Sequence, residues 1–135
     1  MKIDIPSIQN PQIRTFYSLW WPQHQVLIDF FTRLTEEQLD YRMVATPERK
    51  ADTPRESLAH LLYVQLVYLN SVKTKKLEFK SMGTEHYITW SKEQLLAEWE
   101  HIDQETFTYL TSAAFDSQGK VDVPWGGKMN AVEVK

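Results

Sequence analysis

The segment TPRESLAHLLYVQLVYL, residues 53–69, decides the fold because it combines a clear helix start with a long apolar pattern. Thr53 supplies a capping hydroxyl, Pro54 fits the first helical position, and Glu56 completes the spacing of a reciprocal cap. The apolar residues that follow cover most of a helix circumference: Leu58, Ala59, Leu61, Leu62, Tyr63, Val64, Leu66, Val67, Tyr68 and Leu69. A helix that is apolar on nearly every side lies between neighbours. We therefore predict a central helix from residue 54 to about 75.

Outside this segment, the same two signals predict three more helices. Caps followed by apolar residues at helical spacing mark helices over 11–34, 36–41 and 92–114. Pro22 interrupts the first of them, and a proline removes one backbone hydrogen bond, so we expect a kink or a split there. Residues 42–52 and 77–90 are expected to be loops. Residues 119–127 are expected to be a turn-rich connection with a short extended piece at Val121–Val123.

The end of the sequence carries one more helix signal. Asn130-Ala131-Val132-Glu133 has the spacing of a cap, and the sequence then stops at Lys135. An isolated helical turn is not stable in water. We therefore expect an all-α, up-down four-helix bundle in one domain spanning 1–135. Three long helices and the start of a fourth are present, and the domain is expected to be truncated at its C-terminal end.

Composition narrows the classes of function. The chain has 135 residues, a formal net charge of −3 and no cysteine. The charge gives no attraction to nucleic acid or to an anionic membrane, and the lack of cysteine excludes thiol nucleophiles and thiolate metal ligands. The N-terminal residues contain no apolar core of a secretory signal, and no apolar run approaches the roughly 18 residues of a membrane span. We expect a cytoplasmic protein.

Two histidines are candidate functional residues. His60 shares a helix face with Ser57, Val64, Val67 and Ser71, so its imidazole faces an apolar seam and needs a hydrogen-bond partner or a metal. A core histidine bonded to a backbone carbonyl satisfies the pattern as well as a metal ligand does. His24 aligns with Trp20 on the first helix and is expected to project toward the core, unless Pro22 opens the helix and lets it reach solvent. Two inward histidines on adjacent helices could share one site.

The other candidates are weaker. His101 lies between glutamates on a charged face and is expected to form a solvated pair, and His86 lies in a loop. Asp103 falls beside an apolar stripe and is expected to be a boundary residue. The sequence contains no pair of histidines four residues apart, no nucleophile elbow, no phosphate-binding glycine loop and no dinucleotide fingerprint.

Taken in order, these segments resemble the DinB/YfiT-like family. The resemblance rests on LTEEQLDYR at 34–42, a proline-containing loop, the segment 53–69, a third helix, and VPWGGKMNAVE at 123–133. It implies a four-helix bundle with a divalent metal, zinc or nickel, held by three histidines. One histidine comes from the second helix, where His60 matches, and two come from the fourth helix. Those two would lie beyond Lys135, so the printed sequence holds one third of the expected site.

The resemblance implies a metal-dependent enzyme acting on small molecules, either a thiol-dependent transferase or a hydrolase. His60 would be a metal ligand, and His24 and Trp20 would line the pocket. A second hypothesis is a metal-free, non-enzymatic bundle that acts through association, because three long helices with an open seam expose apolar surface. A homodimer is the expected form of that association.

Overall fold

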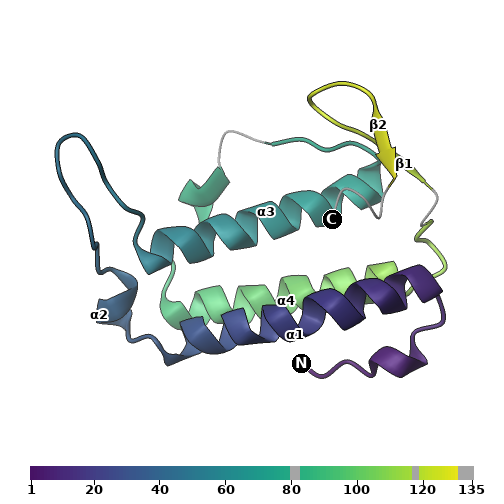
Figure 1. Cartoon of the computed structure of the whole chain (residues 1–135), viewed down its shortest axis with the longest axis horizontal. Helices are drawn as coiled ribbons and strands as arrows, with labels where there is room; N and C mark the ends of the chain where they lie inside the picture. Colours follow the sequence, from purple (N-terminus) through teal and green to yellow (C-terminus); the bar gives the residue numbers. More distant parts are fainter. Residues whose placement is uncertain (80–82, 117–118, 131–135) are drawn as a thin grey trace.

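Three long helices dominate the structure. A computed structural model describes residues 1–79, 83–116 and 119–130. The helices α1 (Pro11–Arg33), α3 (Pro54–Thr74) and α4 (Lys92–Leu110) run along the longest axis of the molecule (Figure 1). The shorter elements are the 3-10 helices η1 (Ile5–Ser7) and η2 (Gly83–His86), the helix α2 (Glu36–Leu39), and the strands β1 (Lys120–Asp122) and β2 (Lys128–Asn130). The prediction of a helical bundle is confirmed.

Side-chain caps start the α-helices α1 to α4 where the sequence predicts. The Asn10 side chain accepts hydrogen bonds from the first turn of α1, and reciprocal caps form at Thr35 and Ser91. The prediction of a third reciprocal cap is wrong. The Thr53 hydroxyl accepts a hydrogen bond from the Glu56 backbone, but the Glu56 carboxylate forms an ion pair with Arg42. That pair attaches the preceding loop to the start of α3.

One of the two alternatives predicted at Pro22, and one predicted helix boundary, need correction. Helix α1 continues through Pro22 without a split, and Trp21 and His24 on either side of it are both buried. The packing of these turns therefore offsets the one hydrogen bond that the proline lacks. Helix α4 ends at Leu110 rather than 114. The hydroxyls of Thr111 and Ser112 bond to backbone carbonyls of the preceding turn, which competes with continuation of the helix.

A small hairpin closes one end of the bundle. Strands β1 and β2 are antiparallel, and Gly126 and Gly127 supply the positive φ angles, 92° and 88°, of the turn between them. Asp122 also exchanges backbone hydrogen bonds with residues 75 and 77, so the hairpin packs on the end of α3. The extended piece predicted at 121–123 is confirmed. Asn130, the predicted cap of a fourth helix, is the last residue of β2, and the rest of that prediction falls on 131–135, outside the described residues.

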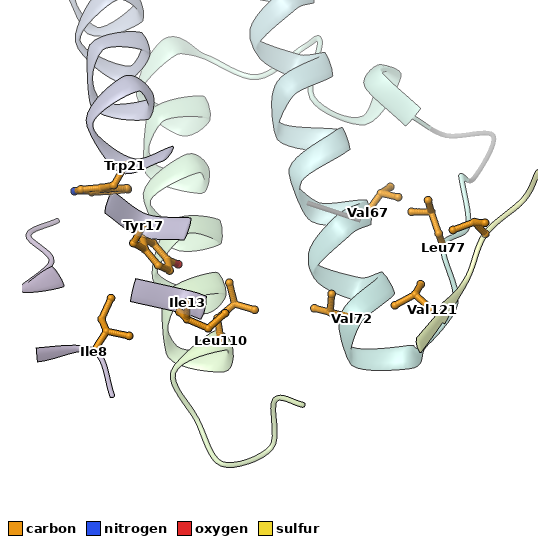
Figure 2. Packing of buried hydrophobic residues seen from close by; sticks show 10 residues of the cluster. Ile8, Ile13, Tyr17, Trp21, Val67, Val72, Leu77, Leu110 and Val121 are labelled. Carbon is orange, nitrogen blue, oxygen red and sulfur yellow. The ribbon is translucent and has the colours of Figure 1, made fainter. Parts of the chain in front are cut away.

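The interior is divided into two apolar clusters. The first lies near the hairpin, and Figure 2 shows side chains from η1–α1 and α4 on one side and from α3 and the hairpin on the other. Its members include Ile13, Tyr17, Trp21, Val67, Val72, Leu110 and Val121. The second lies near α2 and includes Phe31, Leu39, Leu58, Leu62, Tyr87, Leu95, Trp99 and Ile102. Each long helix contributes to both clusters, so the middle of the bundle lies where they meet.

A polar cluster fastens the end of the bundle opposite the hairpin. The Arg55 guanidinium donates to Asp40 at 2.8 Å, to Glu36 at 2.6 Å, and to the backbone carbonyl of Trp90. Glu36 in turn accepts a hydrogen bond from the backbone N–H of Lys92 at 2.7 Å. These contacts join α2, α3 and the start of α4.

Candidate functional site

Between the two apolar clusters, each long helix contributes polar side chains to one buried group. His24 comes from α1, Gln65 from α3, and Asp103 with Trp99 from α4. His24 and Asp103 are 6% and 3% exposed. Polar groups at this depth lower stability unless they find partners, so their hydrogen bonds determine how the helices align.

Asp103 is the centre of this group. Its carboxylate accepts from His24 Nε2, which lies 2.9 Å from both oxygens, and from Gln65 Nε2 at 2.5 Å. The other end of the Gln65 amide accepts a hydrogen bond from Trp99 Nε1 at 3.1 Å. The prediction that Asp103 is a boundary residue is wrong. Three helices meet around its carboxylate, which a helical wheel of α4 alone does not reveal.

The His24 ring is held on several sides. It stacks on Trp20 with 4.1 Å between ring centroids and 24° between planes, and it meets the Trp99 ring edge-on at 5.2 Å. Pro22 does not expose it to solvent. Its Nε2 is engaged by Asp103, and its Nδ1 has no hydrogen-bond partner among the described residues.

His24 and Trp20 both line a cavity of about 220 Å³ between α1, α3 and α4. Its walls are mostly aromatic and aliphatic, and its complete lining is Phe16, Trp20, His24, Leu27, Leu61, Val64, Gln65, Tyr68, Trp99 and Thr106. The described lining contains no lysine or arginine. Asp103 borders a second hollow, between α1 and α4, together with Asp29 and Glu100. The His24–Asp103 pair thus lies between two hollows, with His24 lining the more apolar one and Asp103 the other.

Tyr17 adds a buried hydroxyl close to this group. Its side chain is 1% exposed, and its Oη has no hydrogen-bond partner among the described residues. Burial, and then the negative charge of Asp103, raise the pKa of the Tyr17 phenol. The hydroxyl therefore stays protonated and is available as a hydrogen-bond donor in the interior.

The other histidines lie apart from this group. His60 is exposed, and its Nδ1 lies 3.5 Å from the Thr84 hydroxyl. It does not line the cavity that His24 faces, so the structure does not bring the two histidines into one site. His101 lies 3.8 Å from Glu105 on the outer face of α4, as predicted. His86 contacts Tyr87 and Trp90.

The exposure of His60 corrects its predicted environment. Its face of α3 includes the buried Val67 and Ser71, but within the described residues no element covers the imidazole itself. No three histidine, aspartate or glutamate side chains come together as a metal-binding group in the part of the chain that the structure describes. His60 as a metal ligand therefore stays a prediction.

The fold and the order of the segments agree with a family match. The sequence model of the DinB superfamily matches residues 23–134. The chain belongs to the DinB superfamily. The match includes α3 with His60, α4 with Asp103, and His24 near its beginning. No curated protein and no solved structure matches this DinB chain. None of its described helices is long and apolar enough to cross a membrane.

Sequence reasoning missed Gln65 and misjudged Asp103. Gln65 is a polar residue within an otherwise apolar run, and Asp103 lies beside apolar positions on the next long helix. Each position indicated a buried polar group, because a polar residue on an apolar helix face is stable there only when it has a hydrogen-bond partner. Neither signal identifies the partner, which lies 38 residues away for this pair.

Proposed function

We propose that this DinB protein binds a small, mostly apolar molecule in the cavity between α1, α3 and α4, and acts on it as a transferase or hydrolase. The observation that carries the proposal is the combination of apolar walls with two polar lining residues, His24 and Gln65, that both hydrogen-bond to Asp103. Apolar pockets with a few convergent polar groups are the usual form of small-molecule sites.

The cavity volume indicates the size of the molecule. An engineered apolar cavity of about 150 Å³ binds benzene, and sites for drug-sized ligands start at about 300 Å³. The cavity here, about 220 Å³, falls between them. It therefore fits a single ring with one or two small substituents.

The binding test uses toluene, observed by ligand-detected NMR. Val64→Phe places a ring in the cavity lining and is expected to abolish toluene binding. Met43→Phe is the matched control, because Met43 lies in the loop between α2 and α3, outside the cavity lining, and is 81% exposed. Overpacking costs about 1–3 kcal/mol, so circular dichroism must show that both variants are folded. Equal toluene binding by the two variants contradicts this location.

The metal-dependent form of the proposal rests on family membership and on the match of His60. Bound divalent zinc or nickel would activate a coordinated water or thiol. The described residues do not make up a metal site, because His60 stands without two further ligands beside it. We propose His60 as one ligand, with the remaining ligands coming from outside the described residues. Metal content after zinc or nickel reconstitution is the test, and equal stoichiometry in wild type and His60→Ala refutes the assignment.

A second candidate function is association of two copies. Leu19, Val26 and Phe30 are 67%, 71% and 52% exposed, and their spacing places them along one side of α1. Three large apolar side chains in a row favour a protein contact over solvent, and we propose a second copy of this chain as the partner. Sedimentation velocity tests this: Val26→Glu is expected to dissociate the dimer and Gln104→Glu, exposed on α4, is not. A monomeric wild type contradicts the proposal.

A further inference from the structure

The hydrogen bonds of Asp103 fix which nitrogen of His24 carries a proton. A carboxylate only accepts, so His24 Nε2, at 2.9 Å from both oxygens, must donate. Gln65 presents its NH₂ group to the same carboxylate and its carbonyl to Trp99 Nε1, so the orientation of the amide agrees with this assignment. In the neutral imidazole, the free lone pair is therefore on Nδ1.

That lone pair belongs to a ring on the cavity wall. His24 lines the cavity, and Nδ1 has no hydrogen-bond partner among the described residues. Stacking on Trp20 and the contact with Trp99 restrict rotation of the ring. In catalytic histidine–aspartate pairs, the carboxylate holds the orientation of the imidazole base and stabilises its protonated form. Here the reactive nitrogen is Nδ1, because Asp103 occupies Nε2.

We propose that His24 accepts the proton of a hydroxyl group on a ring-sized ligand in this cavity, and that the ligand is a phenol or a similarly acidic planar alcohol. This inference rests on the proposed binding site. The ligand O–H bond breaks and an N–H bond forms at Nδ1, which leaves a phenolate beside an imidazolium. Asp103 holds the imidazolium through Nε2–H, so the step needs no further reactant.

The charges around the cavity favour a neutral hydroxyl over an anionic ligand. The described lining has no lysine or arginine to pair with a carboxylate or a phosphate, and the Asp103 carboxylate lies just behind His24. An aromatic ring finds contacts with Phe16, Trp20 and Tyr68. The titratable groups around the pair are Tyr17 on α1 and Tyr68 on α3, and in the second hollow Asp29, Glu100 and the Met1 ammonium, which pairs with Glu100.

The test compares two probes of nearly the same shape, 4-nitrophenol and nitrobenzene. The wild type is expected to bind 4-nitrophenol at least about tenfold more tightly than nitrobenzene, because a hydrogen bond with a charged partner contributes this much affinity. Bound 4-nitrophenol is also expected to show the phenolate absorption band at a pH below the pKa of the free phenol. A residue with a purely structural role would not produce this band.

Two variants separate proton acceptance from folding. Asp103→Asn keeps the shape of the side chain and is expected to lose the phenolate band. The double variant His24→Phe/Asp103→Leu removes both partners, which avoids leaving a buried charge unpaired. It is expected to bind both probes equally.

Each outcome decides between the two proposals. If nitrobenzene binds but 4-nitrophenol binds no more tightly and stays protonated, the inference about His24 is overturned and the binding site stands. If neither probe binds the wild type, the binding site and the inference both fail. A phenolate band that persists in the double variant also overturns the assignment to His24.

Discussion

Removing the two members of the His24–Asp103 pair one at a time is expected to cost more stability in sum than removing both together. Asp103→Leu leaves His24 Nε2 and Gln65 Nε2 without their acceptor. His24→Phe leaves a carboxylate with a side-chain exposure of 2% that keeps the Gln65 hydrogen bond but loses the hydrogen bond from His24. The double variant removes the donor and the acceptor together.

The hydrogen bonds of the structure set the magnitudes. Two buried donors without an acceptor cost about 1–3 kcal/mol each, so Asp103→Leu is expected to cost about 2–6 kcal/mol. A buried carboxylate that loses one of its hydrogen-bond donors costs at least about 1–3 kcal/mol, which is the expectation for His24→Phe. In the double variant only the Gln65 amide stays without a partner, at about 1–3 kcal/mol. The two substitutions should therefore be non-additive by at least about 2 kcal/mol.

Urea unfolding followed by far-ultraviolet circular dichroism measures these differences, since tryptophan fluorescence is affected by Trp20 and Trp99 beside the pair. His101→Phe is the matched control, because His101 lies on α4 with a side chain that is 64% exposed. The control is expected to stay within about 0.5 kcal/mol of wild type. If the double variant loses as much as the sum of the two single variants, the pair is not the unit that we describe.

Three further predictions concern other parts of the molecule. The hydrogen bond from Arg55 holds the pKa of Asp40 below its usual 3.8, so the stabilisation from this contact is present above that pH and is lost as pH falls below it. The difference in urea midpoint between wild type and Arg55→Met should therefore shrink on acidification. A difference that stays constant contradicts this. Burial raises the pKa of Tyr87 from 10.0 to about 12, so the wild type should lose stability as pH rises through this interval. Tyr87→Phe should flatten that loss in alkaline urea titrations, and an unchanged slope is the contrary result. His60→Ala should leave the thermal midpoint of the metal-free protein nearly unchanged, because the imidazole is exposed; a marked fall would indicate a structural role.

The positions of the helices follow from short stretches of sequence. A cap at Ser91 acts within four residues, and the apolar spacing of segment 53–69 acts within one or two turns. Both effects are local, so the helix starts and the central helix were predicted. The absence of a split at Pro22 and the early end of α4 arise where side-chain packing or hydroxyl hydrogen bonds compete with local propensity.

The burial of His24 and the exposure of His60 show what a helical wheel cannot predict. A helical wheel placed both His24 and His60 toward apolar neighbours, which is correct for each helix considered alone. Whether a neighbour covers that face depends on the other helices. His24 is buried against α4, and His60 is exposed in the described part of the chain.

The sequence by itself determined that this chain forms three long helices with apolar faces, and that His24, His60 and Asp103 lie on them. The tertiary structure alone decided that His24 meets Asp103 across 79 residues, with Gln65 as their third partner. Caps and periodicity set where a helix begins and which side is apolar. The rotation and the shift of one helix against another are set by packing of the two apolar clusters, and these determine which polar side chains come together.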